Sequence, residues 1–284
     1  MSGNATTRLI YSTLLQLYLL ARGKFSAANV GRLMLDFVEA TGGIVRLLVE
    51  GMLGLLRPPY RVRLVLSQAV VAGWSTVPLI IISQGFLGAI TVMELEFQLE
   101  RLIHNTQLVP GIAALLSFRE YGPSVVAAMV ACKVGAGFTA EIGGMKTTDQ
   151  LDALELMGVN LVHYLVAPRL AACVMMQVCL SIVGVFCAFM AGFLVNIFTS
   201  NFQMYLGTAT DYVGWADFIN LMFKSLALSW IVPVVSCYYG MKAVGGAQGV
   251  GEATTKAVVI EILMIIIGDF TISAVADRLI SAVI

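Results

Sequence analysis

Long runs without any charged residue limit what this chain can fold into more than any other feature. Residues 69–93 and 170–210 contain no Asp, Glu, Lys or Arg, and residues 225–241 form a third run that the apolar stretch before Lys224 extends. A helix needs about 20 mainly apolar residues to cross the hydrocarbon core of a bilayer. In lipid the backbone must pair its own polar groups, so these segments are expected to be helices rather than open strands. The sequence therefore predicts an all-α integral membrane protein.

Two further apolar segments are interrupted by charges. Residues 109–140 include Arg119, Glu120 and Lys133, and residues 257–280 include Glu261 and Asp269. Ionisable residues inside a span are expensive and usually functional, so they do not exclude membrane insertion. We therefore expect five spans, at about residues 69–93, 109–140, 166–199, 218–241 and 255–280.

Composition excludes several classes of function. Only 12% of the residues are charged, against about 25% in soluble domains, and mean hydropathy is +0.89. Lys plus Arg equal Asp plus Glu at 17 each, so no excess of positive charge suggests a nucleic acid partner. The five cysteines and two histidines are scattered without the spacing of metal ligands, and no catalytic triad is recognisable. We expect no catalytic residue, metal or cofactor.

Basic residues predict the orientation. Residues 1–63 hold eight Lys or Arg residues, whereas residues 201–217 hold none and residues 94–107 hold only Arg101. Cytoplasmic loops are enriched in Lys and Arg, which places the N-terminus in the cytoplasm and the C-terminus outside.

The region before the first span is predicted to be amphipathic rather than spanning. In residues 44–57, Arg46, Glu50, Gly54 and Arg57 share one helical stripe and apolar residues fill the rest. Such a helix can lie in the membrane interface, and the alternative is a helix packed on protein. We favour the interfacial position, and we divide the chain into an N-terminal cytoplasmic or interfacial region, 1–63, and a membrane domain, 64–284.

The loop between spans two and three, residues 141–169, predicts a short amphipathic helix. Thr147 and Gln150 have the spacing of a capping box, and Gly158 offers a C-terminal stop. An acidic row follows at helical spacing, formed by Asp149, Asp152 and Glu155. The helix suits docking into a groove on a soluble partner, but a charge row is as often only a solvated face.

The glycine-rich stretch "GGAQGVGEATTKAV", residues 245–258, resembles a phosphate-binding loop only superficially. Such a loop needs Lys and Ser or Thr directly after its last glycine, but Gly251 is followed by Glu252 and Ala253. The carboxylate would repel phosphate, so we expect no nucleotide there. The glycines instead favour a tight reversal, with Thr254 or Thr255 capping the last helix.

Two long segments carry a family resemblance. Residues 119–169, "REYGPSVVAAMVACKVGAGFTAEIGGMKTTDQLDALELMGVNLVHYLVAPR", and residues 238–259, "YYGMKAVGGAQGVGEATTKAVV", resemble the two signature regions of the MlaE/YrbE family, in the same order. This family comprises the permease subunits of Mce-type lipid ABC transporters. The chain departs from the usual pattern at Tyr121, at Cys132 and Lys133, at Gln248 and at Glu252.

The resemblance implies a homodimeric permease of the bacterial inner membrane without ATPase activity of its own. It implies that residues 64–284 are a permease domain that moves phospholipid or a related lipid. The implied partners are a cytoplasmic ABC ATPase, an Mce-domain lipid-binding protein and a STAS-domain regulator. The ATPase would bind the coupling helix, with candidate contacts at Glu141, Lys146, Asp149, Gln150, Asp152 and Glu155.

The lipid is expected to pass through a pocket between the two protomers. Our candidates for the lipid pocket are Arg119, Glu120 and Tyr121, with Glu120 orienting Arg119 toward a headgroup phosphate. We expect Glu141 to order its loop by accepting hydrogen bonds from backbone amides. The alternative function is an ion-coupled secondary transporter that uses Lys224, Glu261 and Asp269, since charges within spans are functional candidates.

Overall fold

The computed structural model describes residues 27–56, 62–104, 106–198 and 201–283, and every regular element in these ranges is a helix. The chain forms two compact units, the first ending at Arg46 and the second running from Leu47 to Ile284. The spans and candidate sites all belong to the second unit.

Helix α2, Ala27–Leu56, begins in the first unit and ends in the second. Within the second unit its last turns pack on protein. A Cβ at Gly54 would lie 3.3 Å from Ala167 Cβ, and one at Gly51 would lie 3.4 Å from Leu170 Cδ1. The other side of these turns is apolar and exposed at Met52 and Leu53. The interfacial position of the helix stays a prediction, and Arg57 of the predicted stripe lies outside the described residues.

Among the residues that the structure describes, five helical segments are long and apolar enough to cross a membrane, which confirms the predicted number. They are Val62–Leu102, Val109–Thr147, Val162–Val195, Trp215–Met241 and Gly246–Val275. The first extends well beyond the predicted 69–93, and its helix α3, Val62–Ile103, continues through the charged residues at both ends. Glu, Arg and Gln are good helix formers, so a charge ends the apolar run without ending the helix.

Spans two and four are irregular. Span two consists of α4 (Val109–Leu116), the π-helical η1 (Ser117–Val125), α5 (Val126–Val130), the π-helical η2 (Ala131–Gly135) and α6 (Ala136–Thr147). Pro123 inside η1 cannot donate a backbone hydrogen bond, which favours a local departure from the α-helix. Span four is α10 (Trp215–Leu228) followed by α11 (Ile231–Met241).

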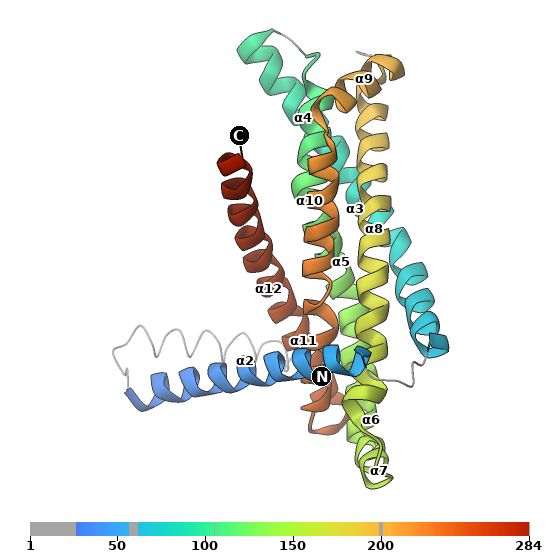
Figure 1. Cartoon of the computed structure of the whole chain (residues 1–284), viewed down its shortest axis with the longest axis vertical. Coiled ribbons are helices and arrows are strands. Elements are labelled where there is room, and N and C mark those ends of the chain that lie inside the picture. Colours follow the sequence, from blue (N-terminus) through green and yellow to red (C-terminus); the bar gives the residue numbers. More distant parts are fainter. Residues whose placement is uncertain (1–26, 57–61, 105, 199–200, 284) are drawn as a thin grey trace, which may run out of the picture. The chain divides into compact units, whose positions relative to one another are not determined.

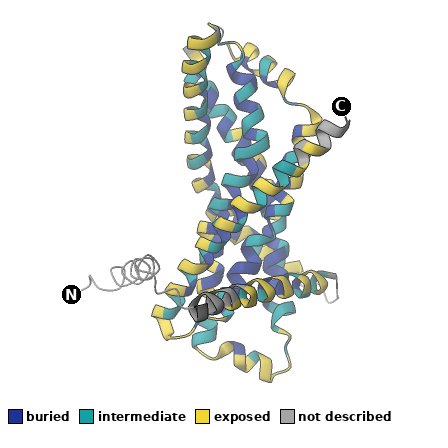
Figure 2. Ribbon diagram, turned by 90° about the vertical axis from the view of Figure 1, so that its left-hand side faces the viewer, coloured by how far each residue is buried: buried dark blue, intermediate teal, exposed yellow. Residues whose placement is uncertain are grey.

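The first and third spans pack closely through small residues. A Cβ at Gly88 of α3 would lie 2.2 Å from the carbonyl oxygen of Ala188 on α8 (Ala167–Val195). Without a side chain at that position the two backbones can approach, as is common between membrane helices. Figure 2 shows buried residues on the sides of the spans that face one another and exposed residues on the outside.

The segment before span four, predicted only as a loop, contains helix α9, Phe202–Tyr212. Its Tyr205 is buried against Phe189 and Phe193 of α8, with ring centroids 5.0 and 5.5 Å away. Burial raises the pKa of Tyr205 to about 12. Helix α9 and helix α7, Gln150–Leu156, lie at opposite ends of the helical bundle (Figure 1), which we call the α9 end and the α7 end.

Both helix caps predicted from threonines are wrong. Thr147 is the last residue of α6 and donates to the carbonyl of Gly144, while α7 begins after Asp149, which has a left-handed φ of 57°. The last helix, α12 (Gly246–Val283), begins at the glycines, so Thr254 lies in its interior and donates to the carbonyl of Val250. A hydroxyl inside a helix can bond the carbonyl four residues earlier, so the sequence alone does not identify it as a cap.

Two predictions that rest on glycines are confirmed: the chain reversal before the last helix and the end of the short helix at Gly158. Gly245, which precedes α12, and Gly246, its first residue, have φ of 98° and 68°. Gly158 has a φ of 75° just after α7, and the amide of Val159 donates to the carbonyl of Leu154. Glycine adopts this conformation without steric cost.

Candidate functional site in the spans and at the α7 end

Lys224 of α10 lies at the centre of a charge network inside the bundle. Its side chain is fully buried, and its ammonium donates to the carbonyl of Arg119 at 2.7 Å and to Glu120 Oε2 at 3.1 Å. The same nitrogen forms an ion pair with Asp269 Oδ1 of α12, also at 3.1 Å. Two of the three N–H donors of the ammonium are thus used in hydrogen bonds, and Asp269 contributes an ion pair. Lys224 thus connects spans two, four and five.

Arg119 of η1 belongs to a second ion pair in the same network. Its Nε lies 2.6 Å from Asp217 Oδ1, and the other carboxylate oxygen of Asp217 accepts from the amide of Gly214 at 3.0 Å. The Asp217 side chain is 7% exposed and that of Arg119 is 37% exposed. Asp217 therefore bonds the guanidinium through Nε, while part of the Arg119 side chain remains accessible.

The network corrects the expected role of Glu120. Glu120 bonds Lys224 and accepts from Ser273 of α12 at 3.5 Å, whereas Asp217 is the residue that orients Arg119. Neighbouring positions of η1 thus engage different spans. Two cations, Arg119 and Lys224, lie among three carboxylates, so each cation has an acidic partner, as a low-dielectric interior requires.

Two buried amides support the irregular backbone of η1. Gln84 of α3 donates to the carbonyl of Tyr121 at 2.8 Å, and Gln177 of α8 donates to that of Pro123 at 3.3 Å. Both glutamines are almost completely buried. Backbone carbonyls freed by an irregular helix in a membrane need such partners. Our sequence reasoning missed both glutamines, although an isolated amide in an apolar run is a usable signal. Tyr121 itself is half-buried.

An apolar cavity of about 420 Å³ lies beside this network, between α8, α9, α10 and the second span. Phe118 and Phe218, the sequence neighbours of Arg119 and Asp217, both line it, and most other lining residues are Phe, Ile, Leu, Val or Met. Its volume is within the range of ligand pockets. The charged pair and the cavity therefore share η1 and α10.

Helix α7 presents a mixed surface. Leu151 is buried, while Leu156 and Met157 are strongly exposed, at 90% and 68%. Of the predicted acidic row, Asp152 forms an ion pair with Lys146 of α6 at 2.7 Å. Asp149 precedes the helix with a left-handed backbone, so it does not belong to the row on the helix. The α7 end thus exposes apolar and acidic groups together.

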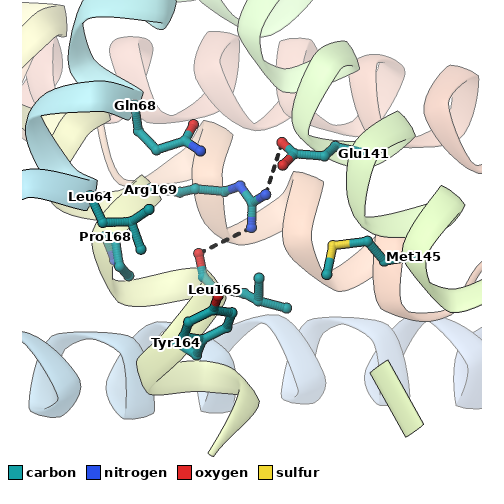
Figure 3. Close-up of a pocket in the computed structure, with 8 residues that line it drawn as sticks. All are labelled: Leu64, Gln68, Glu141, Met145, Tyr164, Leu165, Pro168 and Arg169. Atoms are coloured by element: carbon teal, nitrogen blue, oxygen red, sulfur yellow. Dashed lines mark hydrogen bonds and ion pairs between the residues drawn. The ribbon is translucent and has the colours of Figure 1, made fainter. Parts of the chain in front are cut away.

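Glu141 has a partner that the sequence did not reveal. Its Oε2 lies 2.8 Å from Nη2 of Arg169, which is 3% exposed and also donates to the carbonyl of Leu165 (Figure 3). This side-chain ion pair replaces the expected hydrogen bonds to backbone amides. It joins α6 to the beginning of α8, so it connects the two ends of the loop that carries α7. The sequence did not identify Arg169 as the partner of Glu141.

Glu261 of α12 is separate from the charge network. It is fully buried and accepts from Ser236 of α11 at 2.5 Å. Its other oxygen lies so near Gly135 that a Cβ there would approach it to 2.2 Å. Glu261 precedes Asp269 by eight residues, about 12 Å along a helix. The structure therefore does not combine Glu261 with Lys224 and Asp269 as one ion site.

The comparisons with known proteins agree with this architecture. Residues 65–275 match the family described as Permease MlaE. A probable ABC transporter permease protein of Rickettsia felis is 30% identical over 249 residues, which are 87% of this chain and 96% of that relative. A probable ABC transporter permease protein of Synechocystis is 33% identical over 211 residues, 73% of this chain and 80% of the relative. The protein of this description from Porphyra purpurea is 34% identical over 201 residues, with 68% and 74% covered. The chain therefore belongs to the MlaE family of ABC transporter permeases.

Proposed function

We propose that this protein is the permease subunit of an ABC transporter that moves phospholipid or a related lipid. An ABC transporter permease implies a separate ATPase, so ATP hydrolysis is assigned to a partner chain and not to this one. The ion-coupled alternative loses its basis, because Lys224 and Asp269 pair with each other and the family is one of ABC permeases.

The observation that carries the lipid proposal is an accessible arginine whose sequence neighbour, Phe118, lines an apolar cavity. A guanidinium can hold a phosphate through two parallel hydrogen bonds, and 37% of the Arg119 side chain is exposed. The neighbouring cavity offers aromatic and aliphatic side chains suited to an acyl chain. A phosphate next to a long apolar group describes a phospholipid.

The coupling proposal is that the ATPase binds α7. Exposed Leu156 and Met157 can enter an apolar groove, and Glu155 and Asp152 can face basic residues around it. The Glu141–Arg169 pair would then transmit a displacement of the loop to spans two and three.

The remaining partners are proposed from the family resemblance. We propose a homodimer in the bacterial inner membrane, with lipid passing between the protomers. An Mce-domain protein would exchange lipid at the α9 end, and a STAS-domain regulator would act on the ATPase at the α7 end.

The coupling helix is tested by reversing two of its charges. The double variant Asp152→Arg, Glu155→Arg should reduce the amount of ATPase that co-purifies with the permease. Each exposed ion pair contributes at most about 1 kcal/mol, so single variants should show little and the double variant a several-fold loss. The measurement is the ratio of ATPase to permease after affinity purification from membranes.

The matched control applies the same charge change at the α9 end, as Glu94→Arg, Glu100→Arg, where both acids are exposed. Equal ATPase recovery with the α7 variant and with this control would exclude α7 as the docking site.

The lipid contact is tested with Arg119→Ala. Loss of the guanidinium should lower the phospholipid that co-purifies with the permease by about tenfold or more, because a charged hydrogen bond contributes about 1.5–3 kcal/mol. Mass spectrometry of extracted lipid, normalised to protein, measures it. Arg63→Ala, which removes an exposed arginine at the α7 end, is the control.

The Arg119→Ala protein must also keep its dimer and its ATPase. Unchanged lipid occupancy combined with a less stable dimer would mean that Arg119 has only a structural role.

A further inference from the structure

A second cavity, which unlike the first has charged and polar side chains in its lining, lies at the α7 end, apart from the charge network. It has a volume of about 140 Å³ and lies between α3, α6 and the segment that joins η3, Val162–Val166, to α8. Figure 3 shows Gln68, Glu141 and Arg169 pointing into it from three different helical segments. Polar side chains from three spans that converge on one cavity form a site that the proposed transport pathway does not use.

Arg169 lines this cavity and has hydrogen-bond donors that no protein group uses. A guanidinium has five N–H groups, and the structure pairs two of its nitrogens, Nη1 with the carbonyl of Leu165 and Nη2 with Glu141. Its side chain is 97% buried, and its Nε has no hydrogen-bond partner. A buried donor without a partner is costly and usually marks an absent acceptor. The geometry of guanidinium favours an oxyanion such as phosphate.

Glu141 adds a negative charge to the cavity, opposite in sign to that of Arg169. Its carboxylate is 52% exposed, and only Oε2 contacts Arg169. The other oxygen can accept from an ammonium group, and Gln68 can donate to a phosphate from the facing helix. The cavity therefore offers donors for an anion and an acceptor for a cation within a few ångströms, which complements a zwitterion better than a simple anion.

The surroundings indicate where the rest of such a ligand would lie. From the cavity, α3 continues into the membrane with exposed apolar residues, including Val70, Val71 and Trp74. The cavity is much larger than the roughly 10–15 Å³ that one water requires, but smaller than the about 300–1,000 Å³ of pockets for drug-sized ligands. It can enclose a headgroup, with acyl chains along the exposed face of α3.

We propose that this cavity binds the phosphate-and-amine headgroup of a phospholipid in the leaflet at the α7 end, which is the cytoplasmic leaflet in the predicted orientation. The phosphate lies against Arg169 and Gln68, and the primary amine lies against Glu141. A bound headgroup would contact the Glu141–Arg169 ion pair, which joins the two ends of the loop that carries α7. The lipid composition of this leaflet would therefore change the stability of that loop.

The test uses the full-length permease in nanodiscs with a photoactivatable phosphatidylethanolamine, labelled in its headgroup. We expect crosslinked peptides that contain residues 64–68 and 164–169. Gln68→Leu, which leaves the Glu141–Arg169 pair intact, should reduce this crosslink about tenfold, the effect of one hydrogen bond to a charged group. Ser67→Ala, an exposed neighbour whose hydroxyl bonds its own helix, is the matched control.

Competition identifies the ligand chemistry. Unlabelled phosphatidylethanolamine should displace the probe better than phosphatidylglycerol, which lacks the amine, and Glu141→Gln should remove that preference. Equal competition by the two lipids in the unaltered protein, or an unchanged crosslink in Gln68→Leu, would overturn the proposal. Displacement by free phosphoethanolamine or inorganic phosphate at equal concentration would assign the site to a soluble ligand and overturn its assignment to lipid.

The proposal for this site and the proposal for the transport site can be refuted independently of each other. The crosslink at the α7 end should persist in Arg119→Ala, whose effect is confined to the network beside the apolar cavity. A loss of this crosslink in Arg119→Ala would contradict the separation of the two sites.

Discussion

Replacing Lys224 with methionine should strongly destabilise the folded permease. Lys224 is fully buried and forms ion pairs with both Glu120 and Asp269, and methionine fills much of the same volume without the charge. Removing one partner of a buried ion pair typically costs about 3–5 kcal/mol, because the remaining charge is left unpaired. We expect a large loss of folded protein in membranes and a much lower midpoint of thermal unfolding in detergent.

Lys256→Met is the control, since Lys256 lies on α12 with its side chain exposed. The triple variant Lys224→Met, Glu120→Gln, Asp269→Asn should recover part of the lost stability, because it removes the stranded carboxylates together with the ammonium. An unfolding midpoint for Lys224→Met equal to that of Lys256→Met would show that the network does not hold the spans together.

Gly88→Ala should separate the first and third spans. Its new Cβ would lie 2.2 Å from the carbonyl oxygen of Ala188 and 2.6 Å from the carbonyl carbon. These are backbone atoms of α8, which cannot move aside as a flexible side chain can, so the helices must shift. Overpacking of this kind costs about 1–3 kcal/mol or more. We expect a lower unfolding midpoint, measured in the same detergent.

Gly137→Ala supplies the comparison, because a Cβ at Gly137 of α6 has nothing within 4 Å. Alanine is the better helix former by about 1 kcal/mol, so this variant should be as stable as the natural protein or slightly more stable. If Gly88→Ala behaved like Gly137→Ala, close contact between α3 and α8 would not be a determinant of the fold.

The charged pairs show why sequence reasoning found the candidate site only in part. Arg119 and Glu120 were recognisable because charges inside an apolar run are rare. Their partners were not, since Asp217 and Lys224 are about a hundred positions away in the sequence. Adjacent residues of opposite charge suggested a pair with each other, but in η1 they engage different partners.

The residues at the α7 end of the bundle give a similar comparison. Gly158 identified a helix stop correctly, since few other residues adopt a left-handed backbone at low cost. Thr147 and Thr254 suggested caps that do not exist, because a hydroxyl bonds a helical carbonyl as readily as an unpaired amide. Glu141 required a cation, and only the packing of α6 on the start of α8 identified Arg169 as that cation.

The sequence by itself determined that this chain is helical and that its described part has five helices long and apolar enough to cross a membrane. That outcome depends on the length and polarity of contiguous segments, and a bilayer responds to these properties one segment at a time. Tertiary structure decided how far each helix continues, where span two becomes π-helical, and which charge neutralises which. Those features depend on contacts between segments such as α10 and η1, and the free energy of a buried charge is set by the partners that the fold brings to it.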